Sequence, residues 1–222
     1  MRGILIGVVV VLIPLSAQAS PQVAVSVGMD GGHHTHPDCD GGTIGVNLDT
    51  QLRMGIFTVG GAIGYDAYAM DGAPVHAGIL AARAGIAVPL AATAPNPERR
   101  TVQIDGIGSF EVGRHHYSAD GEDSDFLGPT TYYLGNDVYA NFVGARIGTS
   151  MTIRPRGASN AVIFKMELVG RRDLTRGMLE YDATSCGGLF RSESDCDSSH
   201  DMTRVGGTEM AIATSVGVVF GK

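Results

Sequence analysis

The feature that most constrains this chain is a period-two alternation of apolar residues with small or polar ones. In the last run, TEMAIATSVGVVF, every second residue from Thr208 is apolar or Thr, and the residues between are mostly small. Successive side chains of a β-strand point to opposite faces, so each run predicts a strand with one apolar face. The runs cover residues 22–29, 44–54, 57–66, 79–88, 102–112, 139–151, 162–171 and 208–220. No helical period competes with them, which predicts an all-β fold.

The connections between the runs alternate between short and long. Short turns are expected at Met54-Gly55, 91–100 and 155–160, and mostly longer loops at 30–42, 67–75, 117–136 and 176–207. Short turns on one side and long loops on the other are typical of bacterial outer-membrane barrels. The sequence therefore predicts a closed antiparallel eight-stranded transmembrane β-barrel with short periplasmic turns and long outer loops.

The N-terminus has the pattern of a secretory signal peptide. Arg2 precedes an apolar run at residues 3–13, and Ala17-Gln18-Ala19 forms a small-x-small cleavage site. A membrane anchor is the alternative, but a spanning helix needs about 20 apolar residues. We therefore expect a signal peptide at residues 1–19 and an outer-membrane β-barrel domain at 20–222.

The charge of the mature chain argues against one class of partner. Removing Arg2 leaves 15 basic against 23 acidic residues, a net charge of −8. Nucleic-acid-binding proteins usually carry a basic surface, so no nucleic-acid partner is expected.

The small and partly charged face of the strands is predicted to point into the barrel. An eight-stranded barrel has an interior just wide enough for side chains, which favours small residues there. A soluble lipocalin-like barrel would reverse the faces, but soluble surfaces carry many Lys and Glu and few Gly or Ala. An Arg or Lys exposed to mid-membrane lipid costs about 2–4 kcal/mol. Buried charges must be paired, and the predicted lumen ion pairs draw on Asp49, Arg53, Asp66, Arg83, Asp105, Glu111, Arg146, Arg154, Lys165, Glu167, Arg171 and Glu209.

In this architecture the chain resembles the small eight-stranded outer-membrane proteins of the OmpA transmembrane-domain and OmpX type. The resemblance covers residues 22–221 and rests on the strand pattern and not on a residue motif. It implies the barrel-assembly machinery as a partner, which in that family recognises a C-terminal aromatic residue. Here Phe220 is followed by Gly221 and Lys222.

The segment HHTHPDCDGG, residues 33–42, is the densest group of potential metal ligands. His33, His34, His36 and Asp38, next to Cys39 and Asp40, offer the imidazole, carboxylate and thiolate groups that zinc, copper or nickel prefer. The alternative is a polar surface loop, since the spacing matches no standard zinc module. No cofactor is predicted.

The outer loops hold two further features. A disulfide between Cys186 and Cys196 is expected in an oxidising exterior, although Cys39 competes as a partner. The segment SADGEDSD, residues 118–125, together with Asp195, Asp197 and Asp201, makes the outer loops acidic, which suits a divalent cation. A solvated acidic loop is the alternative interpretation.

Two pairs of residues suggest lipid chemistry. Arg114 and Arg172 interrupt the lipid face at the outer strand ends, where lipopolysaccharide and other outer-membrane lipids present phosphates that Arg binds well. Simple extension into water is the alternative. The spacing of His116 and Ser118 resembles that of lipid A deacylases, but Ala119 stands where that family has Asn.

Three functions follow from these observations. The sequence favours a non-enzymatic outer-membrane barrel with a structural or surface-interaction role. The alternatives are a narrow channel for small solutes and a lipid-acting barrel hydrolase.

Overall fold

A computed structural model describes residues 20–36, 39–70, 73–93, 100–124, 130–186 and 196–221. Within them there are no helices, and so no helix long and apolar enough to cross a membrane. The expected signal peptide lies outside the described residues. The strands are β1 (Gln22–His36), β2 (Cys39–Met54), β3 (Phe57–Met70), β4 (Ala73–Ala92), β5 (Thr101–Ser118), β6 (Gly121–Ser124), β7 (Thr130–Gly135), β8 (Val138–Arg154), β9 (Ala161–Asp173), β10 (Gly177–Cys186), β11 (Cys196–Val205) and β12 (Thr208–Phe220).

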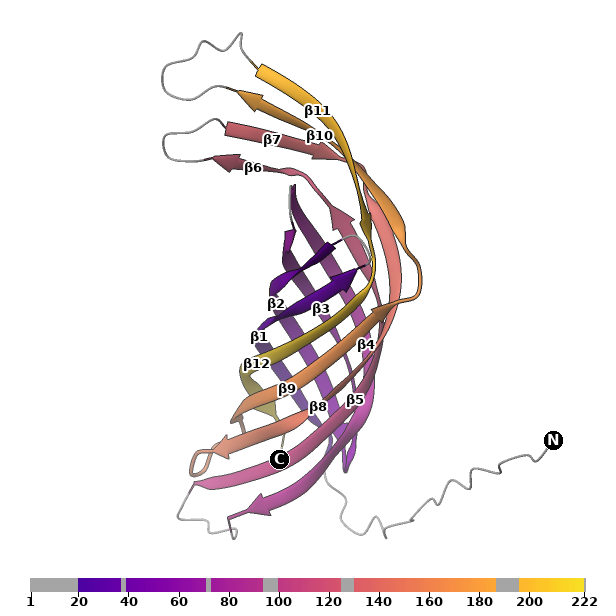
Figure 1. Ribbon diagram of the computed structural model, residues 1–222. Helices are drawn as coiled ribbons and strands as arrows, with labels where there is room; N and C mark the ends of the chain where they lie inside the picture. Colours follow the sequence, from indigo (N-terminus) through magenta and orange to yellow (C-terminus); the bar gives the residue numbers. More distant parts are fainter. Residues whose placement is uncertain are drawn as a thin grey trace, which may run out of the picture.

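Eight of these strands form a closed antiparallel barrel, as the sequence predicts. Their order is β1-β12-β9-β8-β5-β4-β3-β2, and the last strand pairs with the first from Val23 opposite Phe220 to Thr35 opposite Thr208. Closure satisfies the backbone hydrogen bonds of every strand, which a lipid environment requires. The first and last strands begin and end on the side of the short turns (Figure 1).

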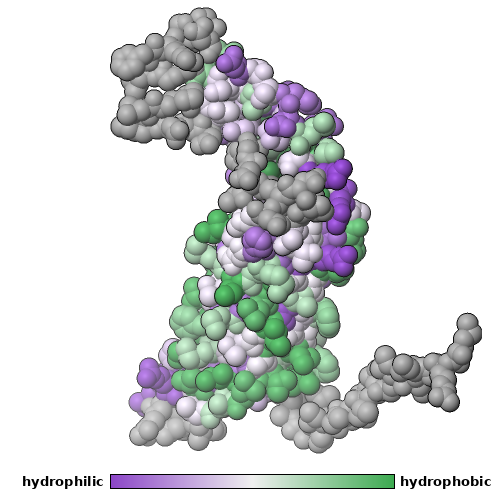
Figure 2. All heavy atoms as spheres, viewed as in Figure 1, coloured by the Kyte–Doolittle hydropathy of each residue, from purple (hydrophilic) through white to green (hydrophobic). Residues whose placement is uncertain are grey.

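The outer face of the barrel is apolar, and the inner face is small or charged. Phe110, Ile147 and Met210 point outward with 77%, 67% and 62% of their surface exposed. Hydrophobic residues gather over the barrel strands, whereas hydrophilic ones gather nearer the outer sheet (Figure 2). In water such a surface would be unfavourable, so lipid covers the apolar face of β12 and its neighbours.

The expected loops at 30–42 and 67–75 are wrong. β1 continues to His36 and β2 begins at Cys39, while β3 continues to Met70 and β4 begins at Ala73. Outside the membrane a strand needs no apolar face, because no lipid covers it there. Backbone hydrogen bonds to the neighbouring strands are enough to continue it into water. The apolar alternation therefore stops before the strands do.

The two other long connections also form β structure. β6 and β7 extend the β5–β8 hairpin, β10 and β11 extend the β9–β12 hairpin, and the four make a separate sheet in the order β11-β10-β7-β6. We call this the outer sheet. It continues one side of the barrel wall and curves above the barrel (Figure 1).

Four short breaks separate the barrel from the outer sheet, at residues 119–120, 136–137, 174–176 and 206–207. Polar side chains take over backbone hydrogen bonds there. Asp120 accepts from the Gly135 amide at 2.8 Å, and Asn136 accepts from the Glu180 amide at 2.9 Å. Asp173 accepts from the Gly207 amide at 2.9 Å.

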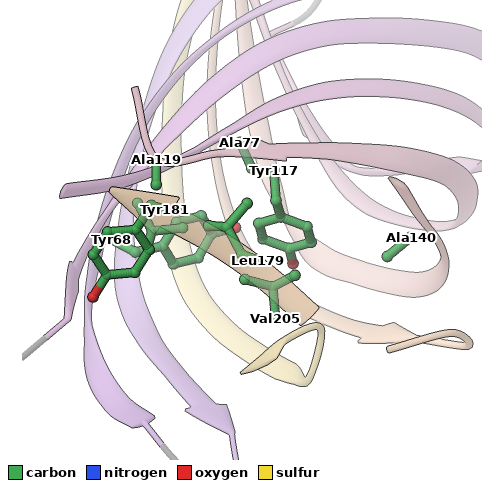
Figure 3. Packing of buried hydrophobic residues seen from close by; sticks show 9 residues of the cluster. Tyr68, Ala77, Tyr117, Ala119, Ala140, Leu179, Tyr181 and Val205 are labelled. Carbon is green, nitrogen blue, oxygen red and sulfur yellow. The ribbon is translucent and has the colours of Figure 1, made fainter. Parts of the chain in front are cut away.

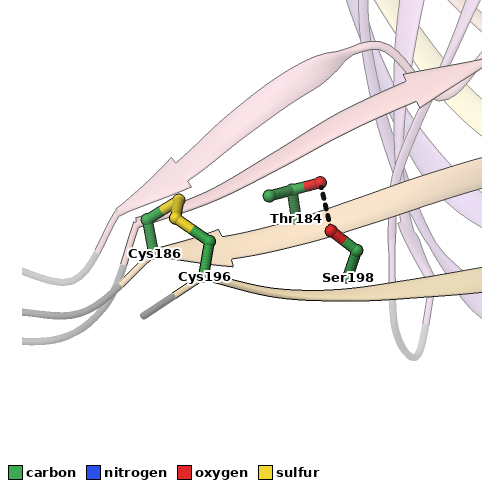
Figure 4. The surroundings of a disulfide bond; sticks show 4 residues. All are labelled: Thr184, Cys186, Cys196 and Ser198. Atoms are coloured by element: carbon green, nitrogen blue, oxygen red, sulfur yellow. Dashed lines mark hydrogen bonds between the residues drawn. A yellow bond between two sulfur atoms is a disulfide. The ribbon is translucent and has the colours of Figure 1, made fainter. Parts of the chain in front are cut away.

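A disulfide joins Cys186 to Cys196 across the end of the β10–β11 hairpin, which confirms the predicted pairing (Figure 4). Thr184 and Ser198 form a side-chain hydrogen bond of 3.1 Å across the same two strands. The pair of cysteines lies in the outer sheet, away from the barrel ladder.

We expect replacement of both Cys186 and Cys196 by Ser to loosen the hairpin without preventing barrel assembly. Closing a loop of this size stabilises by roughly 2–3 kcal/mol in the chain-entropy model, but the barrel strands do not depend on it. Protease digestion of intact cells should cleave the outer sheet of the variant faster than that of the wild type. Loss of the compact, heat-sensitive gel band in the variant would contradict this expectation.

Candidate functional site

A network of ion pairs fills the middle of the lumen. Glu111 on β5 is its centre, at 1% exposure: its carboxylate lies 2.7 Å from Nε of Arg171, 3.0 Å from Nε of Arg83 and 3.7 Å from Nη1 of Arg146. Gly144, opposite Glu111 on β8, leaves room for this side chain. Three guanidinium groups thus share one buried carboxylate.

The network continues in both directions. Toward the short turns, Arg83 also pairs with Asp49, and Lys165 lies 3.7 Å from the same carboxylate. Arg146 pairs with Glu167 at 3.0 Å. Above the centre, Nη1 of Arg171 lies 3.5 Å from Asp66 and 3.2 Å from Glu209.

Two predicted lumen cations lie near the short-turn end. Arg53 forms an ion pair of 2.7 Å with Asp105, and Gln103 donates to the same carboxylate at 2.7 Å. Arg154 differs from the expectation: it donates to the Ser159 carbonyl in the β8–β9 turn, and within the described residues no ion pair includes it. At the end of β8 the backbone carbonyl is within reach, so Arg154 needs no carboxylate.

Four polar side chains are buried in the lumen although the sequence analysis did not place them there: Asp30, His34, His115 and Asp173. Asp30 and His34 are 4% exposed and His115 is 2% exposed. Nδ1 of His115 lies 2.8 Å from Asp173, and the Tyr117 hydroxyl donates to Asp173 at 2.8 Å. Continuing the alternation past Gly28 and Glu111 would have placed Asp30, His34 and His115 on the lumen face.

Two histidines of the histidine-rich segment, His33 and His34, point away from each other. His33 is exposed whereas His34 is buried in the lumen, because neighbouring residues of β1 point to opposite faces. His36 belongs to β1 but its side chain is not described, and Asp38 lies outside the described residues. A single ion therefore cannot be held by His33 and His34 together while β1 stays paired.

An apolar cluster lies at the outer mouth of the barrel, where the outer sheet meets the rim (Figure 3). It joins Tyr68 of β3 and Tyr117 of β5 to Leu179 and Tyr181 of β10 and Val205 of β11. Leu179 is completely buried there, and Tyr117 and Val205 are each 1% exposed. The outer sheet thus packs its side chains onto the barrel rim.

The outer sheet is polar beyond this cluster. His200 on β11 lies 2.8 Å from Asp182, a hydrogen bond that raises the pKa of its imidazole. Asp197 and Asp201 are exposed on the same strand. This strand, at an edge of the outer sheet, presents mainly charged and hydroxyl groups to water.

The lipid-facing arginines occupy different settings. The guanidinium of Arg114 stacks over the Tyr139 ring at 4.3 Å, and His116 stacks on the same ring at 4.5 Å. Arg114 also lines an apolar groove of about 630 Å³, together with Leu80, Val112, Val143 and Leu174 among others. Arg172 is exposed on β9, where it pairs with Val143 of the neighbouring strand.

The His116 and Ser118 pair does not form a nucleophile and base. Nε2 of His116 lies 3.0 Å from Asp137, whereas the Ser118 hydroxyl accepts a hydrogen bond from the Asp120 amide at 3.2 Å. Within the described part of the chain, no hydrogen bond connects His116 to Ser118. The two side chains are each engaged in local structure at the end of β5.

A closed eight-stranded barrel with an apolar outer band and an ion-paired interior is the architecture of an integral outer-membrane β-barrel protein.

Solved structures with similar folds include neisserial surface protein A, which is 10% identical with a TM-score of 0.45, over 90% of this chain and 97% of that one. The N-terminal barrel domain of Pseudomonas aeruginosa OprF is 14% identical with a TM-score of 0.31, over 88% and 97%. A major outer membrane protein from Thermus thermophilus is 10% identical with a TM-score of 0.35, over 90% and 100%. No protein-family model and no curated protein matches the sequence.

Proposed function

We propose that the protein is a non-enzymatic and non-conducting outer-membrane barrel that acts at the cell surface through its outer sheet. The observation that carries this proposal is the filled lumen: the ion pairs around Glu111 occupy its middle, and the cluster around Leu179 packs at its mouth. A barrel whose lumen is filled with side chains is suited to act as a scaffold for what it presents outside.

The dimensions of the lumen support this proposal over a channel. A cavity between Asp49, Arg83 and Lys165 measures about 20 Å³, and another, nearer Arg53 and Ser150, about 30 Å³. A water molecule needs roughly 10–15 Å³ measured in this way. Each cavity thus has room for a water or two but not for a hydrated solute.

We expect the purified wild-type protein to give no discrete conductance steps in planar lipid bilayers. Its fixed ion pairs and apolar mouth together oppose the passage of a hydrated ion. Insertion is verified separately by the heat-dependent shift of the folded gel band from the same vesicles. Reproducible steps that scale with the amount of inserted protein would support the channel alternative instead.

Outer-membrane lipids, including lipopolysaccharide, are the proposed partners of the barrel wall. Arg114 is the charged residue in the lining of the apolar groove that includes Leu80 and Val143, and such a groove suits an acyl chain attached to a phosphate. Arg172 supplies a second exposed guanidinium on β9. The barrel-assembly machinery and a divalent cation at the acidic outer segments remain proposals that rest on the sequence.

A further inference from the structure

A polar cluster lies at the end of the ion-pair network that faces the apolar cluster at the mouth. Asp66 of β3, His115 of β5 and Glu209 of β12 are all buried, and one ligand atom from each lies within 4.8 Å of the other two. Three strands that are distant in the sequence bring these groups together across the lumen. Imidazole and carboxylate are the ligands of divalent transition metals such as zinc.

The charges of this cluster do not balance. Within the described residues, Arg171 is the cation that contacts Asp66 and Glu209, and it also holds Glu111. Asp30 adds a third carboxylate beside Asp66, and its Oδ2 accepts one amide hydrogen bond, from Asn47 at 3.3 Å. Asp66, Glu209 and Glu111 thus share Arg171, and the further carboxylate of Asp30 leaves a negative excess, which a divalent cation would neutralise.

The histidine is oriented as metal-binding histidines usually are. Nδ1 of His115 lies 2.8 Å from the Asp173 carboxylate, whereas its buried Nε2 has no hydrogen-bond partner. Metal-ligating histidines typically donate one ring N–H to a carboxylate, which fixes the tautomer and leaves the other nitrogen free to coordinate. Stacking of the ring on Phe142 at 4.4 Å holds it further in place.

The carboxylates also leave an atom without a partner. Oδ1 of Asp30 is buried and has no hydrogen bond. It lies with Oδ1 of Asp66 in the space that a Cβ on Gly45 would fill, since Asp30, Gly45 and Asp66 are aligned on β1, β2 and β3. Glycine at this position therefore permits two carboxylate oxygens to approach each other.

We propose that Asp66, His115 and Glu209 bind one divalent transition-metal ion, such as Zn²⁺, with Asp30 as a further oxygen ligand. The mixed nitrogen and oxygen donors favour such an ion over Ca²⁺ and Mg²⁺, which prefer oxygen ligands alone. This site is enclosed in the barrel and is distinct from the exposed His33. It does not depend on whether the lumen conducts.

The test is the thermal stability of the folded protein with Zn²⁺, Mg²⁺ or EDTA, combined with measurement of bound metal. We expect one Zn²⁺ per chain. The temperature at which the compact gel band is lost should rise by about 5–10 °C at a 100-fold excess over Kd. Mg²⁺ should give no comparable rise. Absence of both bound Zn²⁺ and a shift in the wild type, or an equal shift with Mg²⁺, would overturn the proposal.

Matched variants locate the ion. His115→Ala should abolish the Zn²⁺ shift, whereas His116→Ala, which removes the next imidazole along β5, and His33→Ala should retain it. Asp66→Asn keeps the side-chain volume, and Gly45→Ala keeps every ligand but displaces the oxygens of Asp30 and Asp66, so both should lose the shift. If His115→Ala does not assemble, Asp66→Asn and Gly45→Ala show whether the Zn²⁺ shift depends on this site. A shift that survives in Asp66→Asn and Gly45→Ala, or that disappears in His33→Ala, would contradict the site.

Discussion

Replacement of Glu111 by Ala should lower the free energy of unfolding by about 3–5 kcal/mol, because it leaves buried charges without their partner. Glu111 contacts Arg83, Arg146 and Arg171, and it is almost completely buried. Arg146 and Arg171 retain Glu167 and Glu209, respectively, but lose the carboxylate that the three cations share. The substitution also empties space in the centre of the lumen.

The chain has no tryptophan, so unfolding is followed by far-UV circular dichroism and by the gel shift in urea. Arg176→Ala is the matched control, because Arg176 is exposed between β9 and β10 and belongs to no described ion pair. Equal decreases in the free energy of unfolding for Glu111→Ala and Arg176→Ala would show that the lumen network contributes little to stability.

Gly148→Val should prevent assembly of the barrel. A Cβ at Gly148 would collide with the Met166 carbonyl oxygen and lie 2.7 Å from Cα of Glu167, both of which belong to the backbone of β9. Backbone cannot yield as a side chain can, so we expect a cost above the roughly 1–3 kcal/mol typical of overpacking. The folded gel band should be absent after refolding into detergent or lipid.

Gly108→Val is the control for this substitution. Gly108 pairs with Ile147 of β8, next to Gly148 in the same ladder, but the nearest atom to its added Cβ is 3.9 Å away. We expect Gly108→Val to assemble normally, with its side chain facing lipid. Normal assembly of Gly148→Val would mean that β8 and β9 can separate more than their register implies.

The strand alternation was sufficient to predict the barrel and the lumen face. Successive side chains of a strand point to opposite faces, so the position of a residue in the alternation determines whether it faces the lumen or the lipid. Glu111 and Arg171 could be placed inward in this way, although their common contact joins β5 to β9, which the sequence alone does not align. The lumen positions of Asp30, His34 and His115 were not predicted, for a different reason. Their strands extend past the apolar region, so the signal that marks a membrane strand had already ended.

The outer sheet was hidden by the same effect. Residues 121–135 and 177–205 lack the regular alternation of apolar residues that marks the membrane strands. The strands in these ranges are held by backbone hydrogen bonds and by a few side chains such as Leu179. The Cys186–Cys196 disulfide could be predicted because the two cysteines are close in sequence. The position of Leu179 above the lumen could not, because it depends on how the sheet curves.

The four breaks between the barrel and the outer sheet have a mechanical consequence. A force applied to a single surface hairpin would break its interstrand hydrogen bonds one after another. Here β7 pairs with β10, so the two hairpins are joined, and a load applied to the outer sheet is divided among the segments at 119–120, 136–137, 174–176 and 206–207. The barrel therefore holds the outer sheet at four points, whereas a single hairpin would be held at two.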